Sequence, residues 1–125
     1  MLRGAESSDL YSEFYNVVLN VGAKRGYSFL IGWASSLERY ECFPSFHGVI
    51  KDFRFMRGDD WDFAFIPNQQ WLLFYFRKPC LRLEKYSHAA IRAHFPEAHE
   101  TPSGEFTVKV ASLEEALRVA AYIES

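Results

Sequence analysis

The sequence lacks the signatures of the common enzyme classes. Its 125 residues contain no Gly-x-Gly-x-x-Gly, no Gly-x-x-x-x-Gly-Lys, no Gly-x-Ser-x-Gly and no His-Glu-x-x-His. Those patterns mark dinucleotide sites, phosphate loops, hydrolase nucleophiles and zinc proteases. The sequence therefore predicts no catalytic residue, no metal and no cofactor, and it favours a protein that is not an enzyme.

The sequence also has few cysteines, a small net charge and no long apolar run. Cys42 and Cys80 stand far apart without a Cys-x-x-Cys pair, so both are predicted to be free thiols. No apolar run is long enough to span a bilayer, and the first nine residues hold no continuous apolar stretch. A net charge of −2 and a pI near 6.1 give no overall attraction to nucleic acid. We therefore expect a small cytoplasmic protein of bacterial type without a membrane partner.

Aromatic residues, by contrast, are abundant. They make up 18% of the chain, and from Phe53 to Phe76 they recur at every second position across two short breaks. Successive side chains of a strand point to opposite faces, so this alternation predicts a three-stranded β-meander over residues 49–56, 61–66 and 70–78. The third strand is apolar on both faces, which predicts a central position in the sheet.

The remaining segments predict helices and one more strand. Apolar spacing indicates a helix over 9–26 that stops at Gly26, a helix over 87–95, a strand over 105–110 and a closing helix behind a capping box of Ser112 and Glu115. Residues 27–46 fit a second helix ended by Pro44, although residues 29–31 could equally extend as a strand.

Together these elements predict an α+β fold of order α(α)βββαβα. Its sheet is small, mixed or antiparallel, and consists of the meander plus the later strand, with helices mainly on one face. We expect one compact domain over 1–125 with a disordered lead-in over 1–8. The apolar stripes of the first helix, the central strand and the last helix predict one core that includes Phe14, Phe74 and Leu117.

One sheet face is a candidate binding surface. If the phenylalanines of the meander point to the helices, the alternate side chains lie on the other face, beside one side of the central strand. That face could be solvated, covered by 27–46, or used to bind a small molecule or a protein. The candidate binding residues are Arg54, Asp62, Trp71, Tyr75, Arg77, Lys78 and Lys109.

Three functions follow from these features. The leading one is a non-enzymatic binding domain that self-associates as a homo-oligomer, because a small core should not enclose so many rings and an aromatic-rich surface should remain. The second is binding of single-stranded nucleic acid, for which the strip Arg77, Lys78, Arg82 and Lys85 would supply cations. The third is a metal-dependent enzyme that uses Asp60 and Asp62 in the acidic turn 58–62.

The order of the elements is similar to the core layout of the PD-(D/E)xK nucleases. That resemblance implies a metal-binding carboxylate near the second strand, where Asp60 or Asp62 lies, and an acid-x-lysine on the third strand, which here has no acid. It therefore implies at most a nuclease-like fold without its metal site. The layout also resembles small bacterial double-wing domains proposed to bind DNA.

Overall fold

A computed structural model describes residues 1–3 and 8–125. Six antiparallel strands form one sheet in the order β1-β2-β3-β4-β6-β5. The strands are β1 (Glu41–His47), β2 (Ile50–Arg57), β3 (Asp60–Pro67), β4 (Leu72–Phe76), β5 (His99–Glu100) and β6 (Phe106–Val110). The helices are α1 (Ser8–Val17), α2 (Val21–Ser35), α3 (Lys78–Leu81), the 3₁₀ turn η2 (Glu84–Tyr86), α4 (His88–His94) and α5 (Leu113–Glu124).

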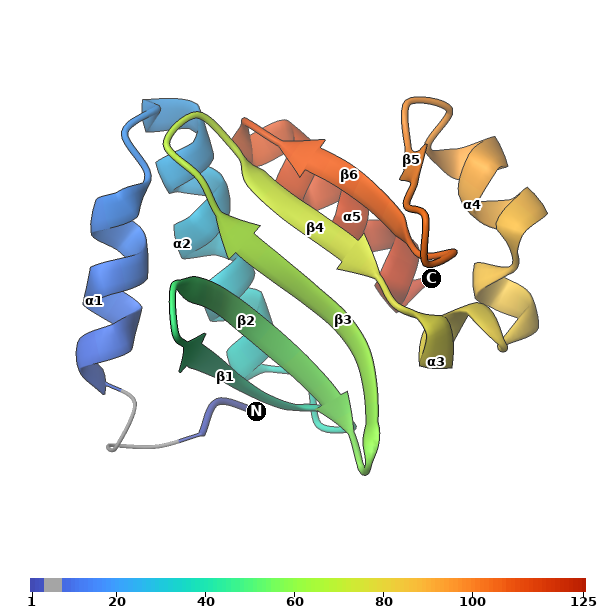
Figure 1. Cartoon of the computed structure of the whole chain (residues 1–125), viewed down its shortest axis with the longest axis horizontal. Helices are drawn as coiled ribbons and strands as arrows, with labels where there is room; N and C mark the ends of the chain where they lie inside the picture. The colour runs from blue at the N-terminus through green and yellow to red at the C-terminus, as the bar shows by residue number, and fades with distance from the viewer. Residues whose placement is uncertain (4–7) are drawn as a thin grey trace.

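The predicted α+β class is confirmed, with the helices mainly on one face. In Figure 1, α2 and α5 lie behind the sheet, α1 flanks one end, and α3 and α4 flank the other. Strands β2, β3 and β4 are the predicted meander, and β3 and β4 lie in the middle of the sheet. Two-residue turns join β1 to β2 and β2 to β3, and each begins with a glycine of positive φ, Gly48 (59°) and Gly58 (63°). A positive φ at the first turn residue alone is the type II′ pattern that suits hairpins.

The predicted helix over 9–26 is wrong. The chain leaves α1 at Val17 and begins α2 at Val21, with the side chain of Asn20 accepting a hydrogen bond from the Ala23 amide as an N-cap. Gly26 does not end a helix but lies inside α2, where a Cβ atom would be 3.2 Å from the Ser112 carbonyl oxygen. Glycine is therefore needed there for close packing against the start of α5.

Residues 29–31, for which the sequence left helix and strand open, are helical, and a strand that was not predicted follows them. The second half of α2 is helical, and β1 then adds a strand beside the meander. Pro44 does not end a helix but lies within β1, which is an edge strand. The Cys42 N–H donates to the Met1 carbonyl oxygen, and the Cys42 C=O accepts from the Arg3 N–H. Both groups therefore point away from β2, and Pro44, two residues on, also faces the outer edge. Proline is tolerated there because it replaces an N–H that the ladder does not use.

Residues 1–8 are predicted to be a disordered lead-in, but the described residues among them include two with regular backbone structure. Leu2 forms a parallel bridge with Cys42, and Ser8 already belongs to α1. Residues 4–7 lie outside the described residues.

The core encloses far more rings than we predicted. Nine of the twelve phenylalanines are buried, and they form a nearly continuous cluster between the sheet and the helices. Phe14 and Phe74 belong to this core as predicted. Leu117 does not, because its side chain is 45% exposed on the outer surface of α5. The buried stripe of α5 is instead Ala116, Val119, Ala120, Tyr122 and Ile123.

Candidate functional site

The sheet face opposite the helices carries most of the predicted binding residues. In the described part of the chain no helix crosses this face, which is turned toward the viewer in Figure 1. The strand register sets Arg54, Ala64, Tyr75 and Thr107 side by side in one row across β2, β3, β4 and β6. Side chains opposite one another in register share a face, so this row runs over the centre of the open sheet.

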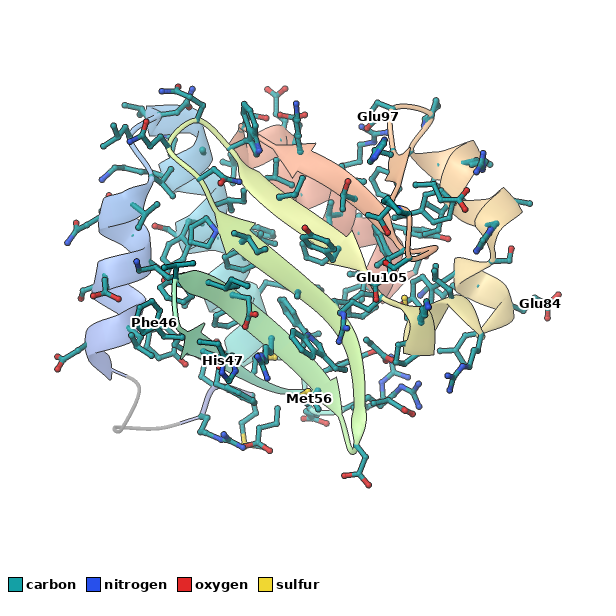
Figure 2. All side chains as sticks on the ribbon, viewed as in Figure 1. Phe46, His47, Met56, Glu84, Glu97 and Glu105 are labelled. Carbon is teal, nitrogen blue, oxygen red and sulfur yellow. The ribbon has the colours of Figure 1, made fainter. Side chains whose placement is uncertain are left out.

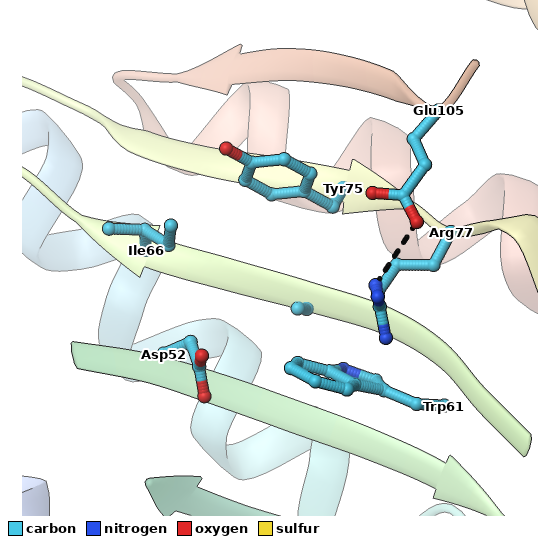
Figure 3. A pocket seen from close by; sticks show the side chains of 7 residues that line it. Asp52, Trp61, Ile66, Tyr75, Arg77 and Glu105 are labelled. Atoms are coloured by element: carbon cyan, nitrogen blue, oxygen red, sulfur yellow. Dashed lines mark ion pairs between the residues drawn. The ribbon is translucent and has the colours of Figure 1, made fainter. Parts of the chain in front are cut away.

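A hollow of about 180 Å³ opens in the middle of this face. Ala64 is the small member of the central row and leaves the space, while larger side chains from neighbouring positions surround it (Figure 3). The lining residues are Asp52, Trp61, Ala64, Ile66, Tyr75, Arg77 and Glu105. Four of them, Trp61, Ala64, Ile66 and Tyr75, are apolar or aromatic and the other three are charged, so the hollow is an apolar recess with charged groups at its side.

Trp61 is not among the candidate binding residues that the sequence predicts, and neither are the lining residues Asp52, Ala64, Ile66 and Glu105. The Trp61 indole lies between two guanidinium groups, with the Cζ atoms of Arg54 and Arg77 at 3.9 and 3.8 Å from the ring centroid. The indole N–H donates to the Phe63 carbonyl oxygen at 3.0 Å, which fixes the orientation of the ring. Each cation–π contact is worth about 0.5–2 kcal/mol, depending on solvent exposure. The ring and both arginines are therefore held in one rigid stack.

A register shift explains why Trp61 was missed. Phe55 pairs with Phe63, but Met56 pairs with Trp61, so β3 has one extra residue at this point. Such a β-bulge changes which side chains reach a given face. Strict alternation from Phe63 puts Asp62 on the open face, whereas the bulge brings Trp61 there instead.

Asp62 is therefore a correction to the predicted site. It is fully buried, and its carboxylate accepts hydrogen bonds from the Tyr40 hydroxyl at 3.0 Å and from Nε of Arg57 at 2.7 Å. Burial, followed by the nearby Asp62 charge, raises the pKa of Tyr40. This buried network joins β2 and β3 to the segment after α2, and it leaves Asp62 unavailable to a ligand on the open face.

The charges on the open face compensate one another. Nε of Arg54 lies 2.8 Å from Asp52, and Nε of Arg77 lies 3.3 Å from Glu105 (Figure 3). Burial and, to a lesser extent, the Glu105 charge raise the pKa of Tyr75, whose hydroxyl thus stays neutral near pH 7. Around the hollow, these two ion pairs leave no unpaired positive charge of Arg54 or Arg77 for a polyanion.

Trp71 and Lys109 form a second contact on the same side, with the Lys109 ammonium 4.2 Å from the centroid of the Trp71 ring. Lys109 also lines a larger and more polar hollow of about 540 Å³ at the β6 edge. The other lining residues are Leu73, Glu97, His99, Thr107 and Glu115, of which Glu97, in the loop between α4 and β5, is labelled in Figure 2.

The predicted basic strip does not form one surface. Arg77 belongs to the Trp61 stack, whereas Lys78 begins α3 and Arg82 follows it, both exposed beyond the end of β4. The Lys85 ammonium donates to the carbonyl oxygens of Ile123 and Ser125 and is thereby engaged at the end of α5. These cations point to different partners and do not follow a common groove.

Cysteine and metal chemistry find no support in the described residues. Cys42 and Cys80 are free and buried, and burial raises the pKa of both thiols, that of Cys42 to about 11. Asp60 and Asp62 both face Arg57, at 3.5 and 2.7 Å, so a guanidinium neutralises them. Within residues 1–3 and 8–125, no group of three His, Cys, Asp or Glu side chains is arranged to hold a metal ion. No described helix has the length and apolarity needed to cross a membrane.

The candidate site is thus the open sheet face with its central hollow. The structure brings Arg54, Tyr75 and Arg77 together around Trp61, places Trp71 and Lys109 nearby, and separates Lys78 and Asp62 from them. Comparison of the chain with known protein families, with curated proteins and with solved structures finds no match.

Proposed function

We propose that this protein is a non-enzymatic binding domain and that its open sheet face docks a partner protein. The observation that carries the proposal is the hollow over Ala64, bordered by the fixed Arg54–Trp61–Arg77 stack and by Tyr75. Protein interfaces are enriched in aromatic residues, methionine and arginine at their centre and are polar at the rim. The open face follows this pattern, with ion pairs beside an apolar recess.

The size of the hollow favours a side chain over a whole small molecule as its occupant. Sites that enclose drug-sized ligands measure roughly 300–1,000 Å³, whereas this recess holds about 180 Å³. One large apolar or aromatic side chain of a partner would fill it as an interface anchor. The partner we propose is therefore a protein segment that presents an aromatic side chain to the hollow.

Peptide selection against a filled-hollow variant tests this proposal. Random peptides displayed on phage are selected on the wild type, with removal of those that also bind Ala64→Trp, in which the new indole occupies the recess. We expect an enriched motif with an aromatic residue, and synthetic peptides of that motif should bind the wild type in the micromolar range and lose at least tenfold in affinity on Ala64→Trp.

A second variant and a matched control complete the experiment. Tyr75→Ala should also weaken the peptides, whereas Val49→Ala, at the exposed β1–β2 turn, should not. Thermal melts of each variant establish that it is folded. Selection that yields no peptide able to distinguish the wild type from Ala64→Trp, or a motif without large apolar residues, would refute the proposal.

Binding of single-stranded nucleic acid is a second candidate. The observation that favours it is the combination of rings and cations on an open antiparallel sheet, in the Trp61 stack and in the Trp71–Lys109 pair. The paired carboxylates of Asp52 and Glu105 oppose it. Anisotropy with a labelled oligothymidine at low salt separates the two, since binding that weakens steeply with salt would favour this candidate.

We also place the protein in the cytoplasm. The support for this placement is that both cysteines are unpaired, as is usual in a reducing compartment.

A further inference from the structure

The outer surface of α5 leaves apolar side chains partly exposed. Leu113 and Leu117 are 39% and 45% exposed, although the apolar spacing of α5 predicts both as core residues. One turn further, Ala121 continues the same exposed stripe. An apolar ridge on the solvent side of a helix favours contact with another molecule.

The neighbouring stripe of α2 is small instead of bulky. Ser28 and Gly32 are exposed on α2, and a Cβ atom at Gly32 would meet nothing within 4 Å. Glycine inside an exposed helix lowers its stability relative to alanine. Gly22 and Gly26 of the same helix are explained by close contacts with the start of α5, but no contact in the described chain requires glycine at 32.

The two helices lie side by side and run in the same direction. Gly26 lies against Ser112 and Ala116, while Trp33, near the other end of α2, donates to Glu124 at the end of α5. At this offset Leu117 is level with the stretch between Ser28 and Gly32. The ridge of α5 and the notch of α2 therefore stand at the same height in adjacent helices.

Charges follow the same complementary pattern. Arg25 on α2 and Glu114 on α5 stand at about the same level, both are exposed, and neither makes an ion pair within residues 1–3 and 8–125. The α2 surface is thus notched and positive near its start, where the α5 surface is ridged and negative.

We propose that a second copy of this chain covers this surface through a two-fold axis parallel to the helices. Such an axis keeps each level unchanged and places α2 of each copy against α5 of the other. Leu117 of each copy then enters the notch between Ser28 and Gly32 of the other, and Arg25 meets Glu114, twice by symmetry. Two-fold contacts of this kind use one self-complementary patch and are the commonest among soluble oligomers.

The proposed dimer differs from the self-association that the sequence predicts, because its exposed ridge is aliphatic, whereas the predicted contact uses an aromatic-rich surface. It is independent of the proposed sheet-face function, since it uses the opposite side of the molecule.

Sedimentation velocity from low micromolar to several hundred micromolar tests the dimer. We expect the wild type to dimerise with a micromolar dissociation constant, because two short helices per copy form an interface at the small end of the stable range. Leu117→Glu should raise that constant at least tenfold while leaving the monomer folded, since Leu117 is on the surface. The matched control Val49→Glu alters a more exposed apolar residue elsewhere and should dimerise as the wild type does.

Two further variants test the shape and charge of the contact. Gly32→Leu should raise the melting temperature of the monomer by favouring the helix and yet weaken the dimer at least tenfold by filling the notch. Arg25→Glu and Glu114→Arg should each weaken the dimer, and their combination should restore it.

A wild type that remains monomeric throughout the concentration range would overturn the inference. So would a dimer that survives both Leu117→Glu and Gly32→Leu, because its interface would then lie elsewhere. The protein variant Ala64→Trp, in which the hollow is filled, should leave dimerisation unchanged. Failure of the dimer proposal is therefore distinguishable from failure of the proposed peptide binding.

Discussion

Replacing Phe74 with alanine should remove a large part of the stability of the fold. Phe74 is fully buried on β4, with ring centroids 6.0, 6.0 and 5.4 Å from those of Phe55, Phe63 and Phe76. The variant loses the transfer energy of the ring and leaves a cavity, which together cost about 3–5 kcal/mol for a buried phenylalanine. A domain of this size is stable by only about 5–15 kcal/mol, so the loss is substantial.

Leu117→Ala is the informative comparison. The apolar spacing of α5 puts Leu117 in the same core as Phe74, but the structure leaves it 45% exposed. Its truncation should change the unfolding free energy by no more than about 0.5 kcal/mol, as for other surface positions. A larger effect is expected only at concentrations at which the proposed dimer forms.

Urea melts at low micromolar protein measure both changes. With a slope of about 1.5 kcal/mol per molar urea, Phe74→Ala should lower the midpoint by about 2–3 M and Leu117→Ala by a few tenths at most. Equal shifts for the two variants, or a small shift for Phe74→Ala, would refute the packing of α5 described above and the central position of β4.

Three further predictions concern single positions. Gly22→Ala should destabilise the protein, because its Cβ would lie 2.5 Å from the Ala111 carbonyl oxygen, whereas Gly32→Ala should stabilise it by up to about 1 kcal/mol; chemical melts with the same sign for both would contradict the packing of α2. Trp71→Phe should cost less than about 1 kcal/mol in the same melts, because the indole N–H is buried without a hydrogen-bond partner among the described residues, and a loss above 2 kcal/mol would show that this N–H is bonded. The pKa of Cys42 is about 11 in the folded state, above the value of about 8.5 expected in the unfolded chain. The stability that depends on this neutral thiol is therefore complete below about pH 8.5 and is lost as pH rises toward the folded pKa. Melts over this pH range should show a weaker pH dependence for Cys42→Ala than for the wild type, and an unchanged dependence would disprove the raised pKa of Cys42.

The meander was predictable because its pattern depends on one local rule. Alternation places Phe53, Phe55, Phe63 and Phe65 on the helix side, and the turn that begins with Gly58 fits a hairpin between β2 and β3. The later strand was predictable on the same basis. Edge strand β1 was not, because Pro44 usually argues against a strand and its tolerance depends on which edge faces outward.

Errors arose where a distant contact decides what a residue does. Gly26 has the sequence context of a helix stop, but its role is set by Ser112, 86 positions later in the chain. Leu117 fits the apolar stripe of α5, yet the helix is rotated so that Ala116 and Ala120 face the core. Small side chains suit the buried side of α5 because α2 packs closely against this helix. Neither fact is encoded within one helix.

The candidate site was predicted in its surroundings but not at its centre. Arg54, Tyr75 and Arg77 follow from alternation along β2 and β4, whereas Trp61 reaches the open face only through the bulge in β3. The same bulge turns Asp62 into a buried partner of Arg57.

The two proposed surfaces lie on opposite sides of the sheet and can therefore act together. A dimer joined through α2 and α5 has its helices at the centre and its two open sheet faces turned outward. Each face of the proposed dimer then offers its own Trp61 stack and hollow, so the proposed assembly would bind two anchors at once. For a partner that carries two anchor segments on a linker of matching length, the second contact becomes intramolecular and can raise the overall affinity by about 10²–10⁴-fold. Leu117→Glu would abolish this gain without touching the hollow, whereas Ala64→Trp would abolish binding without touching the dimer. A tandem peptide with two copies of the selected motif should consequently bind the wild type far more tightly than the single motif, and bind Leu117→Glu no better than the single motif does.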